Sequence, residues 1–154
     1  MGSWPRSEIE SAFVEYQRRA AEAGASGDWR PWADLFTEDA RFVVSGKVIE
    51  GRAAIRGYMA SVHAAGGRGM HVTTNSLVDV DRDGGTAAAS TDYLYVRPSG
   101  DGVAIIAAGR YHDRLVRTTD GWRIASRVEE TLWWDNPMPG LPPIPYPLAD
   151  DAQV

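Results

Sequence analysis

The chain of 154 residues contains no cysteine. It therefore cannot form a disulfide, offer a thiol nucleophile or hold a metal through thiolates, and its composition is typical of a cytoplasmic protein. The three histidines, His63, His71 and His112, lack the spacing of a metal motif such as His-x-x-x-His. No glycine loop of the phosphate-binding type follows a predicted strand. We therefore expect no metal, no nucleotide and no other cofactor.

Long apolar runs and clusters of basic residues are also missing. No run approaches the ~20 apolar residues that a membrane-spanning helix needs, and the N-terminus lacks the pattern of a signal peptide. The net charge is −5, the pI is about 5.1, and the arginines are scattered along the chain. This distribution argues against a nucleic-acid interface. We expect a soluble, cytoplasmic protein with no membrane or nucleic-acid partner.

The length and the 44% hydrophobic content are those of one domain with a single core. We place this domain at residues 1–134. Six of the nine prolines lie in the last twenty residues, 135–154. Proline cannot donate a hydrogen bond to a neighbouring strand, so this segment is predicted to be an extended arm that packs on a surface.

Helical patterns come first in the chain and strand patterns follow. Apolar residues at helical spacing predict a helix from Ser7 to about Gly24, a short helix over residues 28–36 and a helix over 51–65, with a short strand at 41–45 between the last two. Alternating segments bounded by glycine-rich turns predict four strands at 70–81, 86–97, 103–118 and 122–133. This order indicates an α+β fold with an antiparallel sheet.

Ionisable residues in the last predicted hairpin lie where a core is expected. Strict alternation places Tyr111 and Asp113 on an apolar face, with His112 on the opposite face unless a bulge after Gly109 reverses it. On the returning strand the same rule groups Trp122 with Ile124 and places Arg127 on the other face. A carboxylate on an apolar face must be paired, hydrogen-bonded or shifted in pKa. We therefore expect Asp113 to be functional or to pair with Arg114, Arg127 or another arginine.

Four segments in this order resemble the SnoaL-like branch of the nuclear transport factor 2-like superfamily: GDWRPWADLFTEDARF, GRAAIRGYM, MHVTTNSLVDV and GRYHDRLVRTTDGWRI. The resemblance covers roughly Ile9 to Glu129. It implies a cone, in which a strongly curved antiparallel sheet wraps three helices and leaves an internal apolar pocket. Members of the superfamily include ketosteroid isomerase, scytalone dehydratase, limonene epoxide hydrolase, polyketide cyclases and non-catalytic binders, so the fold alone does not fix the function.

The resemblance also implies site residues. The position of Asp113 is similar to that of the acid that donates a hydrogen bond to the enolate in ketosteroid isomerases. Tyr16 corresponds to a cavity-facing tyrosine, and His71 to an acid-base histidine of scytalone dehydratase. Asp92 lies close to an acid of limonene epoxide hydrolase, although Ser90 replaces that enzyme's arginine. The catalytic base of the ketosteroid isomerases is also missing. It belongs on the strand after the second helix, where this chain has Phe42, Val43 and Val44.

We therefore expect His71, Asp113, Asp92 and Tyr16 to be catalytic. Substrate-binding candidates are Tyr111, Asn75, Trp32 and Tyr58. The predicted function is that of a cofactor-independent lyase or isomerase of the dehydratase or cyclase type, acting by acid-base chemistry on a hydrophobic carbonyl or hydroxyl metabolite. A non-catalytic binding or assembly domain is the alternative, and an epoxide hydrolase is a third possibility.

A homodimer is expected from the outward face of the sheet, which packs against a second copy in many relatives. The apolar residues assigned to that face are Val72, Val78, Val80, Tyr93 and Tyr95.

Overall fold

The computed structural model describes residues 4–66, 69–100 and 102–134. The arm predicted for residues 135–154 lies outside these ranges. The elements in chain order are α1 (Trp4–Ser26), α2 (Arg30–Ala33), β1 (Phe36–Val44), β2 (Lys47–Glu50), α3 (Arg52–Gly66), β3 (Met70–Val80), β4 (Thr86–Ser99), β5 (Gly102–Thr118) and β6 (Gly121–Trp134). Their order confirms the predicted α+β class.

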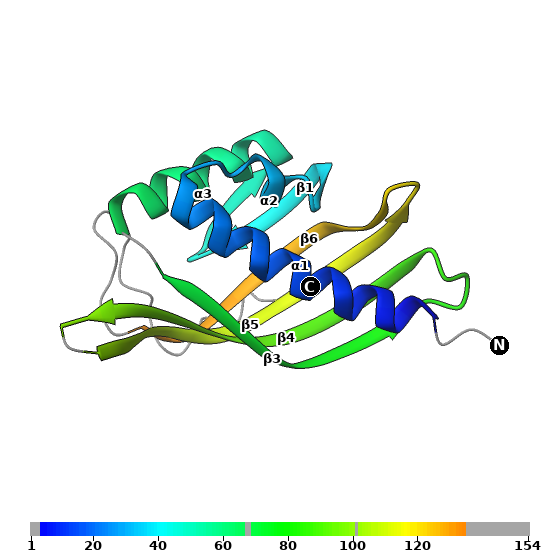
Figure 1. The fold of residues 1–154 in the computed structure, drawn as a ribbon. Helices are drawn as coiled ribbons and strands as arrows, with labels where there is room; N and C mark the ends of the chain where they lie inside the picture. The colour runs from blue at the N-terminus through cyan, green and yellow to red at the C-terminus, as the bar shows by residue number, and fades with distance from the viewer. Residues whose placement is uncertain (1–3, 67–68, 101, 135–154) are drawn as a thin grey trace.

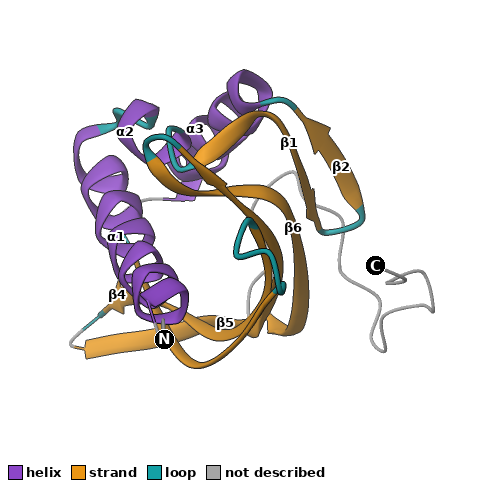
Figure 2. Cartoon of the chain, turned by 90° about the vertical axis from the view of Figure 1, so that its right-hand side faces the viewer, coloured by secondary structure: helices purple, strands orange, loops and turns teal. Residues whose placement is uncertain are grey.

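The strands form one curved sheet in the order β2-β1-β6-β5-β4-β3 (Figure 1). Every pairing is antiparallel except that of β1 with β6, which is parallel and departs from the purely antiparallel sheet that was expected. The sheet curls around the helices without closing (Figure 2). Helix α1 packs along β3 and so covers one edge of the sheet. The result is the predicted cone.

The segment after the second helix differs from the prediction. Phe36 was assigned to that helix but begins β1, and β2 was not predicted. Ser45 and Gly46 both have positive φ, 51° and 73°, as in a two-residue hairpin turn. These residues reverse the chain so tightly that β1 and β2 pair directly.

Helices and sheet bury one main core between them. Ile9 and Phe13 of α1 and Ile55 of α3 meet the aromatic residues Trp32 and Phe36, and all five side chains are buried. Trp32 and Phe36 lie 5.0 Å apart between ring centroids. This packing holds α1 and α3 against the concave face.

Within the described ranges, no helix combines the length and apolar content that crossing a membrane requires.

The outward face differs from the one used to predict a dimer. Tyr93 and Tyr95 are buried on the concave face, and Val78 and Val80 pack against the main core. Only Val72 of the five points outward, with 41% of its surface exposed. An irregularity in β3 between Thr74 and Leu77 reverses the faces beyond it. The homodimer itself stays a prediction.

Candidate active site

A β-bulge places Arg127 on the concave face of the sheet. Leu115 pairs with Ile124, whereas Arg114 pairs with Ser126, so Ala125 is an extra residue in β6. One inserted residue moves every later side chain to the other face of the strand. The expectation that Arg127 faces away from Ile124 is therefore wrong.

Arg127 forms a buried ion pair with Asp113, its cross-strand partner. Nε donates to Asp113 Oδ1 at 2.7 Å and Nη2 donates to Oδ2 at 2.8 Å. Both side chains are essentially inaccessible to solvent. Burial opposes the charge of Arg127, but the Asp113 carboxylate outweighs it and raises the pKa of the guanidinium. Asp113 is thus a paired carboxylate, which disagrees with the neutral hydrogen-bond donor that the resemblance implies.

Two tyrosine rings enclose the guanidinium of Arg127. Its Cζ lies 4.1 Å from the ring centroid of Tyr16 and 4.1 Å from that of Tyr111. The ring of Tyr111 also stacks on Tyr93 at 4.4 Å, so both of its faces are covered. Burial raises the pKa of Tyr16 to about 12 and that of Tyr111 well above its ordinary value. Both hydroxyls therefore remain protonated at neutral pH.

Glu129 follows on the same concave face, two residues after Arg127. Its Oε1 accepts a hydrogen bond of 2.7 Å from the hydroxyl of Tyr93, which also lies 3.3 Å from the hydroxyl of Thr131. Burial raises the pKa of Glu129, although the hydrogen bond from Tyr93 and the charge of Arg127 partly oppose this. Glu129 was not among the predicted site residues, because regular alternation without the bulge at Ala125 places it on the outward face.

His71 lies on β3 with its ring among aromatic side chains. The centroid distances are 4.7 Å to Tyr95, 6.1 Å to Tyr93 and 6.3 Å to His63. Burial lowers the pKa of His71 to about 3, and the nearby His63 and Arg127 add to this effect. The imidazole is therefore neutral at ordinary pH, when it has one donor and one acceptor nitrogen.

Trp32 and Tyr58, the two other aromatic residues predicted to bind substrate, differ in how far they are buried. Trp32 is completely buried, with its ring 5.6 Å from that of Tyr16. Tyr58 of α3 is half-buried, and burial together with the charge of Glu129 raises its pKa. Tyr58 thus lies within electrostatic range of the Glu129 carboxyl.

Asp92 and Asn75 lie on the outward face, apart from the group described above. Asp92 Oδ1 accepts from Arg110 Nε at 2.6 Å, and Asp92 Oδ2 accepts from Asn75 Nδ2 at 3.0 Å. These bonds lower the pKa of Asp92. Asn75 has a φ of 52° within the β3 irregularity, which turns it away from the face of His71. Asp92 and Asn75 were predicted as site residues together with His71, but they lie on the opposite face of the sheet from it.

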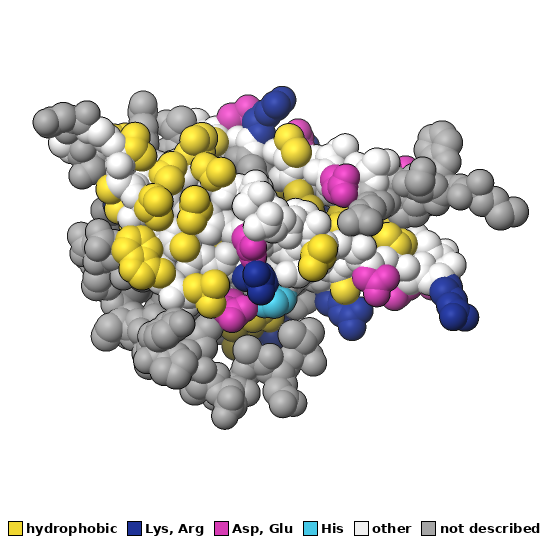
Figure 3. All heavy atoms as spheres, turned by 90° about the horizontal axis from the view of Figure 1, so that it is seen from below, with side chains coloured by type: hydrophobic (Ala, Val, Ile, Leu, Met, Phe, Trp, Pro, Cys, Tyr) yellow, Lys and Arg dark blue, Asp and Glu magenta, His cyan; other side chains and the backbone are white. Residues whose placement is uncertain are grey.

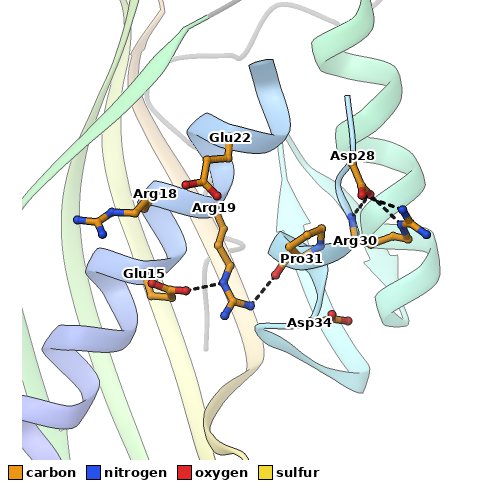
Figure 4. A pocket seen from close by; sticks show the side chains of 8 residues that line it. All are labelled: Glu15, Arg18, Arg19, Glu22, Asp28, Arg30, Pro31 and Asp34. Carbon is orange, nitrogen blue, oxygen red and sulfur yellow. Dashed lines mark hydrogen bonds and ion pairs between the residues drawn. The ribbon is translucent and has the colours of Figure 1, made fainter. Parts of the chain in front are cut away.

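A charged hollow also lies between α1 and α2 (Figure 4). Arg19 bridges it, because Nε donates to Glu15 at 2.8 Å and Nη1 donates to the carbonyl oxygen of Pro31 at 2.8 Å. Asp28 and Arg30 form a further ion pair across 2.8 Å. The bond from Arg19 to Pro31 connects the two helices, and we assign these interactions a structural role. Among the described residues, no group of three or more His, Cys, Asp or Glu could hold a metal ion.

Comparison with known families gives one match over most of the chain. The model of the SnoaL-like domain matches residues 6–128. No protein among the curated proteins matches the chain.

Solved structures give further matches. The chain is similar to Rv3472, a protein of unknown function from Mycobacterium tuberculosis, with 32% identity, a TM-score of 0.71 and coverage of 80% of this chain and 74% of the other. It is similar to an NTF2-like protein with a cystatin-like fold from Novosphingobium aromaticivorans, with 26% identity, a TM-score of 0.68 and coverage of 82% and 81%. Aln2 from a Streptomyces species shares the fold, with 24% identity, a TM-score of 0.72 and coverage of 85% and 93%.

Proposed function

The chain belongs to the SnoaL-like domain family, and from this premise we propose that it is a cofactor-independent lyase or isomerase of the dehydratase or cyclase type. Its substrate is a hydrophobic metabolite with a carbonyl or hydroxyl group. For a carbonyl substrate the reaction begins with transfer of a proton from the carbon next to the carbonyl to a base of the protein, which leaves an enolate; dehydration, cyclisation and isomerisation of such compounds share this step.

The observation that carries this proposal is the environment of His71 and Glu129. Both side chains lie on the concave face of the sheet, and each is only partly accessible to solvent. This is the face on which the resemblance predicts an internal apolar pocket. Burial shifts both pKa values in the direction that favours the neutral form. Titratable groups perturbed in this way are typical of active sites.

We assign complementary roles to these two residues. Glu129, held by the hydroxyl of Tyr93, removes the proton as a carboxylate whose basicity burial has raised. His71 donates a hydrogen bond from its neutral ring to the oxygen on which negative charge develops, and such a donor contributes about 3–4 kcal/mol to the transition state. The hydroxyl of Tyr16 stays protonated and remains our candidate for a second donor.

Asp113 has a positioning role in this scheme. Its carboxylate fixes Arg127, and Arg127 in turn separates the rings of Tyr16 and Tyr111. The third possibility, an epoxide hydrolase, depended on Asp92 as an acid of the site. Asp92 instead lies on the outward face and pairs with Arg110, so we do not propose this activity.

The test uses hydrogen–deuterium exchange at carbon, which detects proton removal whatever reaction follows. A panel of bicyclic and tricyclic aryl ketones is incubated with the protein in D₂O and followed by NMR. We expect exchange above the buffer rate for at least one ketone, and we expect Glu129→Gln to reduce that rate about 100-fold or more. The matched control is Glu130→Gln, the neighbouring carboxylate that pairs with His112 on the outward face. If both variants exchange as fast as the wild type, the assignment is wrong.

One observation favours the alternative, a non-catalytic binding domain. Asp92 and Asp113 each pair with an arginine, as expected if neither takes part in chemistry. In that case the same ketones raise the melting temperature of the protein without any exchange at carbon. Exchange that depends on Glu129 would exclude this alternative.

A further inference from the structure

Hydrophobic side chains gather on one half of the outward face of the sheet (Figure 3). We define this apolar patch by six residues whose exposed fractions run from 36% to 72%: Met70, Val72, Leu94, Val103, Ile105 and Trp133. Cross-strand pairing makes the patch continuous. Val72 pairs with Leu94, Leu94 with Ala108, and Ala108 with Trp133. One apolar row therefore crosses all of β3, β4, β5 and β6.

The patch has a sharp polar border. The next row across the sheet consists of Asp92, Arg110 and Glu130, which pair in register and carry alternating charges. At the end of the patch away from this row, the patch residues Met70 and Val103 line a hollow together with Val96, Arg97 and Pro98. A continuous apolar surface with a charged border is typical of a surface that another segment covers.

We propose that the chain's own residues 135–154 cover the apolar patch. Strand β6 ends at Trp134, which pairs with Ala107, and the preceding residue Trp133 belongs to the patch. The segment that follows therefore starts at the border of the surface it would cover. This segment contains six prolines together with Leu141, Ile144, Tyr146 and Leu148, and it contains no lysine or arginine.

Length and chemistry both agree with this assignment. Twenty residues in a polyproline conformation reach roughly 60 Å. Three strand spacings of about 4.8 Å, or about 14 Å, separate β6 from β3. Proline rings pack well on aromatic and aliphatic surfaces but cannot extend a sheet edge. A proline-rich apolar segment is therefore suited to the face of this sheet.

The test uses disulfide trapping, which is clean because the chain has no cysteine. Leu94→Cys on the patch is combined in turn with Leu141→Cys, Ile144→Cys and Leu148→Cys in the full chain. The matched control replaces Leu94→Cys by Ser90→Cys, four residues away on the same face of β4 and beyond the charged row. After mild oxidation, we expect at least one Leu94 combination to form a disulfide within one chain several-fold more than its Ser90 control.

Other outcomes overturn the proposal. Equal trapping at Leu94 and Ser90, or no trapping in any of the three Leu94 combinations, would show that the segment does not lie on the patch. A disulfide between two chains, including one formed by Leu94→Cys alone, would show that a second copy covers the patch. Mass spectrometry under non-reducing conditions separates these products.

Discussion

Removing one partner of the Asp113–Arg127 pair should be far more damaging than removing both. Asp113→Leu leaves a guanidinium that is 1% exposed without its counter-ion and leaves two N–H donors without acceptors. A lone charge left in a buried pair costs about 3–5 kcal/mol of unfolding free energy. Arg127→Met should cost at least as much, because it also removes two cation–π contacts of about 0.5–2 kcal/mol each.

The double variant Asp113→Leu/Arg127→Met buries two apolar side chains and no charge. We expect its loss of stability to be smaller than the sum of the single losses by about 3 kcal/mol or more. Urea unfolding followed by the fluorescence of the six tryptophans measures all four corners of the cycle. If a single variant is already unfolded without urea while the double variant folds, the single substitution is again the more damaging one.

The matched control is the Asp92–Arg110 pair on the outward face. Its side chains are 27% and 42% exposed, so solvent screening should make its coupling free energy much smaller than that of the buried pair. Additive losses at Asp113 and Arg127, or a larger coupling at the exposed pair, would refute the reasoning about the buried ion pair.

Three further predictions concern the interior. The pKa of His71 is about 3 in the folded protein and about 6.5 in the unfolded chain, so between pH 6.5 and pH 3 only the unfolded chain binds a proton at this residue. The free energy of unfolding should therefore fall by roughly 1.4 kcal/mol for each unit by which the pH decreases in this range. In chemical denaturation at several pH values His71→Asn should lose this slope, whereas His112→Asn should keep it. Because the pKa of Glu129 is raised in the folded protein, ionisation of this residue lowers the free energy of unfolding as the pH rises through that pKa. Glu129→Gln should therefore increase the free energy of unfolding, relative to the wild type, more at pH 7 than at pH 4. An equal increase at both pH values would contradict this. An added Cβ at Gly109 would clash with the carbonyl oxygen of Glu130 and the ring of Tyr93, so Gly109→Ala should lower the unfolding free energy by about 1–3 kcal/mol, whereas Gly24→Ala in α1, with open space around it, should not lower it.

The fold was largely predictable because strong periodicity specifies most of its elements. Alternation correctly grouped Tyr111 with Asp113 on the buried face, and correctly placed His112 on the opposite face. The arginine alternative for Asp113 also proved correct, although the faces assigned to β6 gave no reason to choose Arg127 over other arginines. The predicted α+β class followed from helices that precede a run of strands.

The rest could not be read from alternation, because bulges reverse it. The extra residue Ala125 brings Arg127 and Glu129 inward, and the irregularity near Asn75 turns that residue outward. A bulge depends on how two strands pair, and neither strand carries a local signal strong enough to mark it. Asp92 lies outward through regular pairing with Arg110 and was misplaced because its role came from the resemblance alone.

Titration of His71 and Glu129 by NMR tests the central claim of an interior acid-base site most directly. With ¹³C-labelled carboxyl groups and ¹⁵N-labelled imidazoles, and with Glu129→Gln and His71→Asn to assign the signals, both pKa values are measured in one protein. We predict that Glu129 titrates above 4.5 and that His71 stays neutral down to about pH 3. A Glu129 pKa at or below 4.5, together with a His71 pKa near 6.5, would contradict the account.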